Sequence, residues 1–393
     1  MRWVTVLFTF MLVACQPASP LRMLSLDTAA GSGEPHLAGS AAGEIVLSYL
    51  ESSEASTALR FTVLKGDEWQ AARTVADGDN WFVNWADFPS VVPLHNGLWA
   101  AHWLVKTEGG TYAYDTLVAQ SSDQGQTWSV PVRPHTDGTL TEHGFASLFP
   151  AGDEVGIVWL DGRAYADASD DDDSGVATQL RTAVIDDNQQ RSAQAIVDET
   201  VCDCCQTDIA MAASGPVVVY RNRTHNEIRD IYWARYVEGQ WQSGQAIAKD
   251  GWIISGCPVN GPAIAAVDQR VAVAWFTASP TDRVQVVFSS NSAETFGSAV
   301  DIGADRPLGR VDVAMLANGD AMVSWLESLP AGRLLARRVS PDSTLGPIID
   351  IAPMTVERNS GFPQMVADGN RLIFAWTEVT EETSVVKSAY LPL

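Results

Sequence analysis

Residues 271–275 read Val-Ala-Val-Ala-Trp, an apolar run that ends on a large aromatic residue. Six other segments have this form, and each follows a shorter apolar run and a Gly, Asn or Asp turn. The closing aromatics are Tyr49, Trp103, Trp159, Tyr220, Trp275, Trp325 and Trp376. They are separated by 54, 56, 61, 55, 50 and 51 residues. A near-constant period of this length indicates an array of equivalent structural units.

Each unit has room for four short strands. A second β-type run follows the aromatic residue, as in residues 59–63 and 285–289, and a shorter run completes the unit. Val, Ile, Trp and Tyr in short runs favour strands, and four strands in about fifty residues are typical of a propeller blade. The sequence therefore predicts an all-β fold, a β-propeller with seven blades by repeat count.

The two ends of the chain are expected to contribute strands to the same blade. The last unit, residues 363–393, is long enough for about three strands, whereas residues 21–26 form an isolated apolar segment. An open ring would leave an unpaired strand edge. We therefore expect residues 21–26 to add a strand to the last blade and close the ring. The alternative is that this segment is only a linker.

The first residues have the features of a processing signal. Arg2 precedes an apolar run at residues 3–13, which is too short to span a membrane as a mature helix. The sequence Leu-Val-Ala-Cys-Gln at 12–16 resembles the lipobox of bacterial lipoproteins. This resemblance implies lipid attachment at Cys15 in the cell envelope, with Gln16 favouring the outer membrane. An ordinary secretory signal is the alternative.

These features divide the chain into three parts. Residues 1–14 are predicted to be a lipoprotein signal peptide, and residues 15–35 a lipid-attachment linker with the ring-closing strand. Residues 36–393 are predicted to form a single propeller domain, because seven units of about fifty residues leave no room for a second one.

One turn sequence carries a family resemblance. Residues 121–128, Ser-Ser-Asp-Gln-Gly-Gln-Thr-Trp, resemble the Asp-box (BNR repeat) of sialidases and related propellers, and residues 289–296 resemble a degenerate second copy. Its structural residues are Ser121, Asp123, Gly125, Thr127 and Trp128. In such a turn the Asp accepts backbone N–H groups, the Gly adopts a positive φ and the Trp packs between blades. The resemblance implies a sialidase-like propeller, for which six blades is the alternative count.

The charge of the chain limits its partners. The sequence has 25 Lys and Arg against 48 Asp and Glu, a formal net charge of −23. This balance excludes a nucleic-acid binder and disfavours a polybasic contact with anionic lipid, so membrane attachment would depend on the lipid anchor.

Six arginines nevertheless fall in loops predicted to share one face of the ring, where loops between blades and loops after the second strand emerge. They are Arg163, Arg221, Arg223, Arg229, Arg310 and Arg358. Guanidinium groups bind carboxylates bidentately, so this grouping favours an anionic ligand.

The family resemblance implies a protein that binds an acidic sugar, with exo-α-sialidase-like hydrolysis if it is an enzyme. The residues that we assign to such a site are Asp161, Arg163, Arg221, Arg223, Glu227, Arg229, Arg310 and Glu327. Glu142 and Glu378 are further carboxylates at suitable loop positions. The Arg-Ile-Pro motif of the family is absent, and a catalytic tyrosine cannot be assigned. The alternative is that these arginines and carboxylates pair with one another as salt bridges between loops.

The cysteines suggest a second, competing site. Cys202, Cys204, Cys205 and Cys257 fall in adjacent interblade loops. Outside the cytoplasm two disulfides are expected, with three possible connectivities. A thiolate site for a soft metal such as copper is the alternative, as part of a non-catalytic metal-handling or protein-interaction propeller.

The run of aspartates at 170–173 is interpreted as a solvated loop, with a calcium site or a lid as the alternatives. No cofactor is required by the predicted activity.

Overall fold

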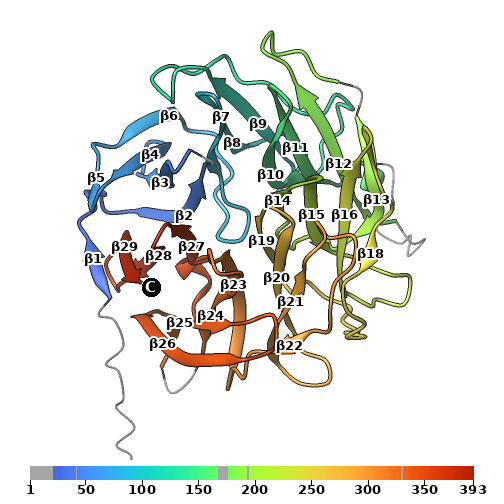
Figure 1. Ribbon diagram of the computed structural model, residues 1–393. Helices are drawn as coiled ribbons and strands as arrows, with labels where there is room; N and C mark the ends of the chain where they lie inside the picture. The colour runs from blue at the N-terminus through green and yellow to red at the C-terminus, as the bar shows by residue number, and fades with distance from the viewer. Residues whose placement is uncertain (1–20, 41, 167–175, 193, 329–330) are drawn as a thin grey trace, which may run out of the picture.

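Seven antiparallel sheets form a ring in the computed structural model of the chain (Figure 1). The structure describes residues 21–40, 42–166, 176–192, 194–328 and 331–393. Each sheet corresponds to one of the seven sequence units, and the closing aromatics lie in the second strand of every blade. The predicted seven-bladed propeller is confirmed, and the six-bladed alternative is wrong. No helix in the described part of the chain is long and apolar enough to cross a membrane.

The first three blades are built from residues 32–201. Blade 1 contains β2 (Ser32–Gly39), β3 (Ile45–Ser52), β4 (Thr57–Lys65), β5 (Glu68–Trp69) and β6 (Arg73–Gly78). Blade 2 contains β7 (Ser90–His95), β8 (Leu98–Lys106) and β9 (Tyr114–Ser121). Blade 3 contains β10 (His143–Ala151), β11 (Glu154–Asp161), β12 (Thr178–Ile185) and β13 (Ala195–Val201), with the 3₁₀ turn η1 (Arg163–Tyr165) after its second strand.

The remaining blades follow the same order from the inner strand outward. Blade 4 contains β14 (Asp208–Ala212), β15 (Gly215–Arg221), β16 (Ile231–Val237), β17 (Gln240–Trp241) and β18 (Gln245–Ala246). Blade 5 contains β19 (Ala263–Val267), β20 (Arg270–Thr277), β21 (Arg283–Ser289) and β22 (Val300–Asp301). Blade 6 contains β23 (Pro307–Met315), β24 (Ala321–Glu327), β25 (Arg333–Val339) and β26 (Leu345–Pro353). The turn η2 (Arg358–Ser360) leads into blade 7.

Blade 7 combines the two ends of the described chain. It contains β27 (Gln364–Asp368), β28 (Arg371–Val379) and β29 (Ser384–Pro392), and β1 (Arg22–Leu24) forms its outer strand. Arg22, Met23 and Leu24 pair with Tyr390, Ala389 and Ser388. The predicted closure of the ring by an N-terminal strand is therefore confirmed. The inner strand of blade 1 begins at Ser32, eight residues after β1 ends.

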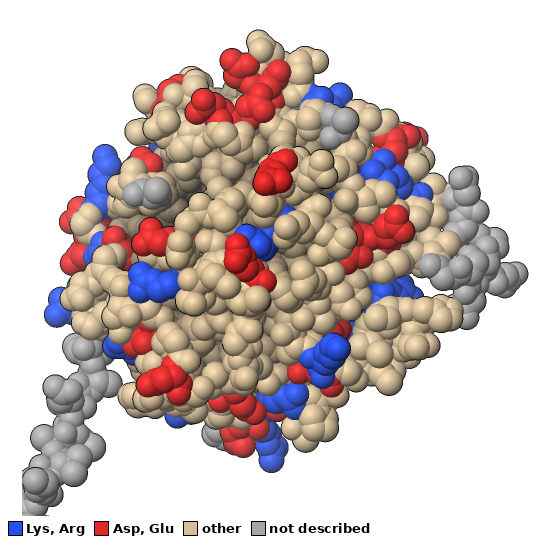
Figure 2. All heavy atoms as spheres, turned by 45° about the vertical axis from the view of Figure 1, so that its right-hand side comes forward, with Lys and Arg blue, Asp and Glu red and all other residues tan. Residues whose placement is uncertain are grey.

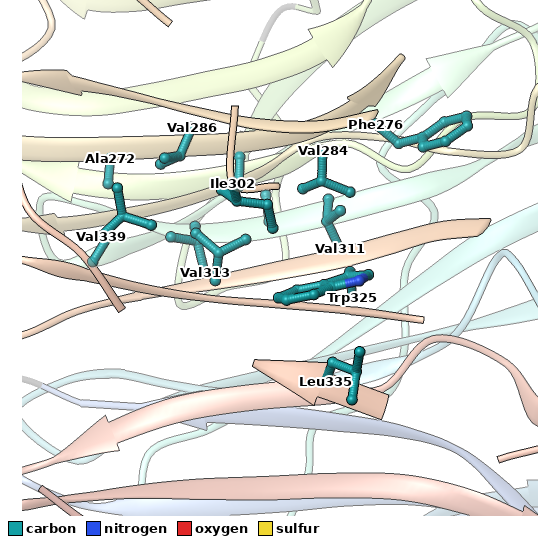
Figure 3. Packing of buried hydrophobic residues seen from close by; sticks show 14 of the residues in the cluster. Ala272, Phe276, Val284, Val286, Ile302, Val311, Val313, Trp325, Leu335 and Val339 are labelled. Atoms are coloured by element: carbon teal, nitrogen blue, oxygen red, sulfur yellow. The ribbon is translucent and has the colours of Figure 1, made fainter. Parts of the chain in front are cut away.

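The second strands are apolar throughout because each is buried on both faces. In β24 all seven residues are buried, and Trp159, Trp275 and Trp325 have no exposed surface. Adjacent blades supply the covering side chains. Figure 3 shows Trp325 and Val311 of blade 6 packed toward Val284 and Val286 of blade 5. Burial of a large side chain in such a layer stabilises the fold by about 2–3 kcal/mol.

The turn at 121–128 has a dense hydrogen-bond pattern. Asp123 Oδ1 accepts N–H groups from Gln126 (3.0 Å) and Thr127 (2.9 Å), and Gly125 has a φ of +71°. Trp128 packs edge-on against Phe61 of blade 1, with ring centroids 5.9 Å apart. The equivalent turn at 289–296 packs Phe296 edge-on against Trp233 of blade 4, at 5.1 Å. Both turns thus join adjacent blades.

The inner strands of blades 3 and 6 contain matching bulges that position the candidate site. Gly144 and Gly309 each precede a residue of positive φ, and the pairing register shifts there. A side-chain oxygen from the loop that leads into the preceding blade reaches each bulge: Asp87 accepts the N–H of Phe145 (2.9 Å), and Asn260 accepts that of Arg310 (2.8 Å). A Cβ would lie 2.1 Å from Asp87 Oδ2 at Gly144 and 2.1 Å from Asn260 Oδ1 at Gly309. Glycine is therefore required at both bulges.

Candidate functional site

Loops that join the blades and loops that follow the second strands emerge on one side of the ring. The antiparallel strand order dictates this, and it directs the turns at 121–128 and 289–296 to the other side. We call the first side the interblade face. Its main loops are residues 79–89, 136–142, 162–166, 202–207, 222–230, 251–262 and 354–363. In the view of Figure 2, basic and acidic side chains are intermixed, without a large patch of one sign.

Arg221 is a buried brace between blades 4 and 5. Its guanidinium group donates hydrogen bonds to the carbonyl oxygens of Arg229 (2.6 Å), Phe276 (2.8 Å) and Asn260 (2.9 Å). It also lies 4.8 Å from the ring centroid of Trp252, and the residue is only 1% exposed. Burial lowers the pKa of Arg221 to about 9. The hydrogen-bond donors of Arg221 are therefore occupied by contacts within the protein.

Arg310 is buried in the same manner at the start of blade 6. It donates to Ser360 Oγ (2.7 Å) and to the carbonyl oxygens of Gly361 (3.0 Å) and Glu357 (3.1 Å). Its guanidinium carbon lies 4.9 Å from the ring centroid of Trp85. Burial lowers the pKa of Arg310 to about 10. Arg310 therefore fixes the loop that leads into blade 7.

Arg223, Glu227 and Arg229 form one ion-pair network. Glu227 Oε1 accepts hydrogen bonds from Arg223 Nη2 (2.8 Å) and Nε (2.9 Å), and Oε2 accepts one from Arg229 Nη2 (2.7 Å). Asp203 accepts hydrogen bonds from Arg223 Nη1 (3.3 Å) and from the hydroxyl of Tyr165 (3.0 Å). Burial would raise the pKa of Glu227, but the two guanidinium groups outweigh it and lower the pKa.

This network is open to solvent. The side chains of Arg223, Glu227 and Asp203 are 25%, 26% and 30% exposed. Two guanidinium groups and two carboxylates cancel in charge. The structure thus brings together three of the residues that we predicted and adds Asp203 and Tyr165, which no sequence motif marked as site residues.

Arg163 and Asp161 lie apart from that network, in blade 3. Asp161 is fully buried and accepts hydrogen bonds from Arg163 Nε and Nη2, both at 2.6 Å, and from the indole N–H of Trp159 at 2.8 Å. Burial would raise the pKa of Asp161, but the Arg163 hydrogen bonds outweigh it and lower the pKa. Glu327 of blade 6 likewise accepts the indole N–H of Trp325, at 2.8 Å.

Beside Asp161, a pair of histidines stacks between two carboxylates. The rings of His135 and His143 are parallel within 4°, with centroids 3.7 Å apart. Asp115 Oδ1 lies 3.3 Å from a nitrogen of each ring, Asp137 lies at the other end, and Arg133 donates to Asp115. The nitrogen lone pairs lie in the ring planes, so face-to-face rings cannot direct them at one ion. We therefore interpret this group as a buried charge network between blades 2 and 3. No motif spacing in the sequence marked it.

Arg358 is the exception among the six arginines. It is exposed and has no carboxylate or carbonyl partner within the described residues. Its guanidinium carbon lies 6.0 Å from the ring centroid of Trp85, which is half-buried and stacks on Phe362 with centroids 5.8 Å apart. A free cation thus lies beside a partly exposed indole.

Glu142 belongs to a third cluster on this face. The hydroxyl oxygen of Tyr114 lies 2.6 Å from Asp87 Oδ2 and 2.8 Å from Glu142 Oε1. Tyr114 and Asp87 are buried, whereas Glu142 is partly exposed. Burial raises the pKa of Asp87 to about 7 and that of Glu142 to about 8. Of these three residues, the sequence analysis selected only Glu142.

Loop 79–89 links these clusters. It contains Trp85 and Asp87, and between them the carbonyl oxygen of Ala86 accepts a hydrogen bond from Gln206 Nε2 at 2.6 Å. Gln206 Oε1 in turn accepts the N–H of Gly261 at 2.9 Å. Next to these hydrogen bonds, the inner strands surround a central cavity of about 810 Å³, lined in part by His36, Asp208 and Asp312.

The four cysteines are paired as two disulfides. Cys202 is joined to Cys205 and Cys204 to Cys257, with Cα separations of 5.7 and 6.1 Å. Arg229 Nη1 lies 3.4 Å from Cys202 Sγ, so the disulfide loop supports the Arg223 network. Two other predicted sites, Cys15 and the aspartates at 170–173, lie outside the described residues.

No family model matches the sequence, and no curated protein is similar to it. Solved structures resemble it in fold. The BP39L lectin from Burkholderia pseudomallei superimposes with a TM-score of 0.63 at 11% identity, over 93% of this chain and 97% of the lectin chain. A protein of unknown function from Dyadobacter fermentans gives 0.52 at 15% identity, over 96% and 99%. The NanB sialidase from Streptococcus pneumoniae gives 0.46 at 9% identity, over 89% and 83%. At these identities the likeness establishes the propeller fold alone.

Proposed function

We propose that this protein is a glycan-binding propeller that takes an acidic sugar of the sialoside type on its interblade face. The observation that carries the proposal is the pair formed by Arg358 and Trp85. A partly exposed indole can stack against the C–H face of a sugar ring, and a guanidinium group without an acidic partner can bind a carboxylate. The five other predicted arginines already have partners, which leaves Arg358 as the cation for an anionic ligand.

The Arg223 network offers the second half of such a site. Asp203, Glu227 and Tyr165 present hydrogen-bonding atoms that are partly open to solvent. Planar carboxylates and a phenol hydroxyl suit the hydroxyl groups of a sugar, and ordered water can fill gaps between them. The Burkholderia lectin, a sugar-binding protein by name, has a propeller of the same kind, which agrees with this assignment.

Two of the predicted acids, Asp161 and Glu227, are not in the state that a general acid needs. A general acid must be protonated before the reaction, and Asp161 and Glu227 are held ionised by their arginine partners. Asp161 is also fully buried. We therefore assign these residues to positioning the loops, and an exo-α-sialidase activity is the alternative that an assay with a fluorogenic sialoside tests.

The binding proposal is tested by calorimetry with 3′-sialyllactose and lactose at low salt. We expect the wild-type protein to prefer the sialylated sugar and Arg358→Ala to weaken that binding by about tenfold or more, the loss of a charged contact. Lys65→Ala, which removes an exposed cation at the opposite end of blade 1, is the control and should bind as wild type. Absence of sialoside binding, or equal binding by Arg358→Ala and wild type, would exclude this assignment.

We also propose that the protein is anchored to the outer membrane through Cys15. The lipobox-like sequence supports this, and Cys15→Ser should move the protein from the membrane fraction to the soluble fraction of the expressing cells. Retention of the variant in the membrane fraction would contradict the anchor.

A second candidate function is the handling of a soft metal by the reduced cysteines. The sulfur atoms of Cys202, Cys204 and Cys205 lie within 4.8 Å of one another, a separation that thiolate ligands of one ion can have. Thiol titration and copper analysis of protein purified without reductant test it. If all four sulfur atoms are oxidised and no copper is found, the metal-handling function is excluded.

A further inference from the structure

Tyr114 lies between two carboxyl groups, at 2.6 Å from Asp87 Oδ2 and 2.8 Å from Glu142 Oε1. Both distances are those of strong O–H···O hydrogen bonds. The phenol hydroxyl has one proton and can donate only one of them. The other bond needs a proton from a carboxyl group, because two facing oxygen lone pairs repel at this distance. One of the two carboxyl groups is therefore protonated.

The surroundings place that proton on Glu142. Asp87 is 2% exposed, and its second oxygen accepts the N–H of Phe145 at 2.9 Å, so its negative charge is stabilised by two donors. The carboxyl group of Glu142 has no hydrogen-bond partner other than Tyr114 among the described residues, and the charge of Asp203 acts on it. The arrangement is a chain in which Glu142 donates to Tyr114 and Tyr114 donates to Asp87.

We propose that Glu142 is a protonated, uncharged carboxylic acid at neutral pH and serves as a polar contact for an anionic sugar on the interblade face. Its outer oxygen can accept a hydrogen bond from a sugar hydroxyl, and without charge it does not repel a sugar carboxylate. An ionised glutamate beside Asp203 would give this part of the site two negative charges. The role in ligand contact rests on the proposed function, whereas the protonated state does not.

Three titratable groups act on Glu142. They are Tyr114 at the start of β9, Asp87 in loop 79–89 and Asp203 in loop 202–207. The adjacent His143 faces Asp115 instead. Burial, followed by the charges of Asp87 and Asp203, raises the pKa of Glu142 to about 8, while the Tyr114 hydrogen bond opposes this rise.

Infrared difference spectra test the protonated state. At pH 7.5, between the raised pKa values of Asp87 and Glu142, we expect the wild-type protein to show a carboxylic acid C=O band that is absent from Glu142→Gln and retained in Asp87→Asn. Subtracting the two spectra removes the contribution of other acids whose pKa is raised. One of them is Asp208, for which burial raises the pKa to about 7. The band should disappear as the pH rises through about 8. No difference between wild type and Glu142→Gln, or loss of the band in Asp87→Asn, would overturn the assignment.

Binding of 3′-sialyllactose at pH 6.5 and pH 9 tests the role in ligand contact. Wild type should lose about tenfold more affinity than Glu142→Gln between these pH values, because wild type gains one additional negative charge, on Glu142. An equal loss in both proteins would overturn this role. If neither protein binds the sugar at either pH, the proposed function fails, and the infrared result still decides the state of Glu142.

Discussion

At the scale of single residues, the six arginines of the interblade face differ in what surrounds them. Arg221 and Arg310 are buried against carbonyl oxygens, and Arg163, Arg223 and Arg229 are paired with carboxylates. Only Arg358 lacks such a partner in the described part of the chain. The sequence analysis placed all six in loops, whereas Arg221 ends β15 and Arg310 lies within β23. Residue type is the same for all six, so the surroundings of each side chain separate structural arginines from a candidate ligand contact.

Arg221→Ala should destabilise the fold by about 3–5 kcal/mol, because it leaves three buried carbonyl oxygens without donors and opens a cavity beside Trp252. Arg358→Ala, at an exposed position, should change the free energy of unfolding by less than about 0.5 kcal/mol. Urea denaturation at pH 7 measures both. Equal effects of the two substitutions would contradict these different roles.

Asp115 gives a pH-dependent prediction. Burial alone would raise its pKa, but hydrogen bonds from His135, His143 and Arg133 outweigh burial and lower the pKa well below the usual 3.8. The carboxylate then stabilises the fold above pH 4, and this contribution is lost as the pH falls through the lowered pKa. Asp115→Asn should cost about 3 kcal/mol at pH 7.

The cost of Asp115→Asn should shrink as the pH falls below 4, because the unfolded wild-type chain then binds a proton at Asp115 and the folded state, with its lowered pKa, does not. Urea denaturation at pH 7, 5, 3.5 and 2.5 measures the difference between the two proteins. Asp153→Asn, at an exposed aspartate, is the control and should show little difference at any of these pH values. If the difference in free energy of unfolding between wild type and Asp115→Asn stays constant with pH, the stabilisation does not depend on the ionisation of Asp115.

At the scale of elements, the inner-strand bulges connect blades 3 and 6 to the loops that lead into blades 2 and 5. Asp87 reaches the bulge of blade 3, and Asn260 reaches that of blade 6. Gln206 makes a similar contact to the N–H of Gly261 in the loop before blade 5, where there is no bulge. The bulge contact itself occurs with two different side chains, each of which supplies one acceptor oxygen. Repetition of geometry without repetition of residue type explains why sequence periodicity did not reveal it.

Gly144→Ala tests this device. The new methyl group would lie 2.1 Å from Asp87 Oδ2 and 2.5 Å from the ring of Tyr114, so the Asp87 hydrogen bonds would have to shift. We expect a loss of at least about 2 kcal/mol in the free energy of unfolding. Gly369→Ala, where φ is +58° and no atom lies within 4 Å, isolates backbone strain and should cost about 1 kcal/mol. A smaller effect at Gly144 than at Gly369 would contradict the close contact.

At the scale of the whole molecule, a three-residue strand closes the ring. β1 pairs with β29, and its Leu24 is 5% exposed and packs with Leu37, Tyr390 and their neighbours. The contact covers the outer edge of blade 7, which would otherwise be unpaired. The fold therefore depends on a segment far from the rest of blade 7 in the sequence.

Leu24→Asp should weaken ring closure by about 3 kcal/mol, because it places a charge in an apolar contact. Met23→Asp changes the adjacent residue of the same strand, which is 59% exposed, and should cost less than about 0.5 kcal/mol. Thermal unfolding of both variants measures the difference. Equal melting temperatures would indicate that β1 does not stabilise the ring.

The sequence by itself determined the architecture. Seven apolar segments ending in aromatic residues at a near-constant spacing predicted the blades, and the short last unit with an apolar segment at 21–26 predicted ring closure. Both inferences succeed because burial of a strand on two faces imposes a local, repeated pattern on the residues. The side of the ring on which the arginine loops emerge followed from the antiparallel strand order alone.

Only the tertiary structure decided which residues are available to a ligand. It brought Arg223, Glu227 and Arg229 together, buried Arg221 and Asp161, and placed Tyr114 between Asp87 and Glu142. It also left Arg358 beside Trp85 without a carboxylate or carbonyl partner among the residues that the structure describes. Each of these outcomes depends on distances between residues from different loops, and hydrogen bonds and ion pairs form within about 3 Å regardless of separation in the chain. A repeat pattern carries no information on such pairings, because each occurs once.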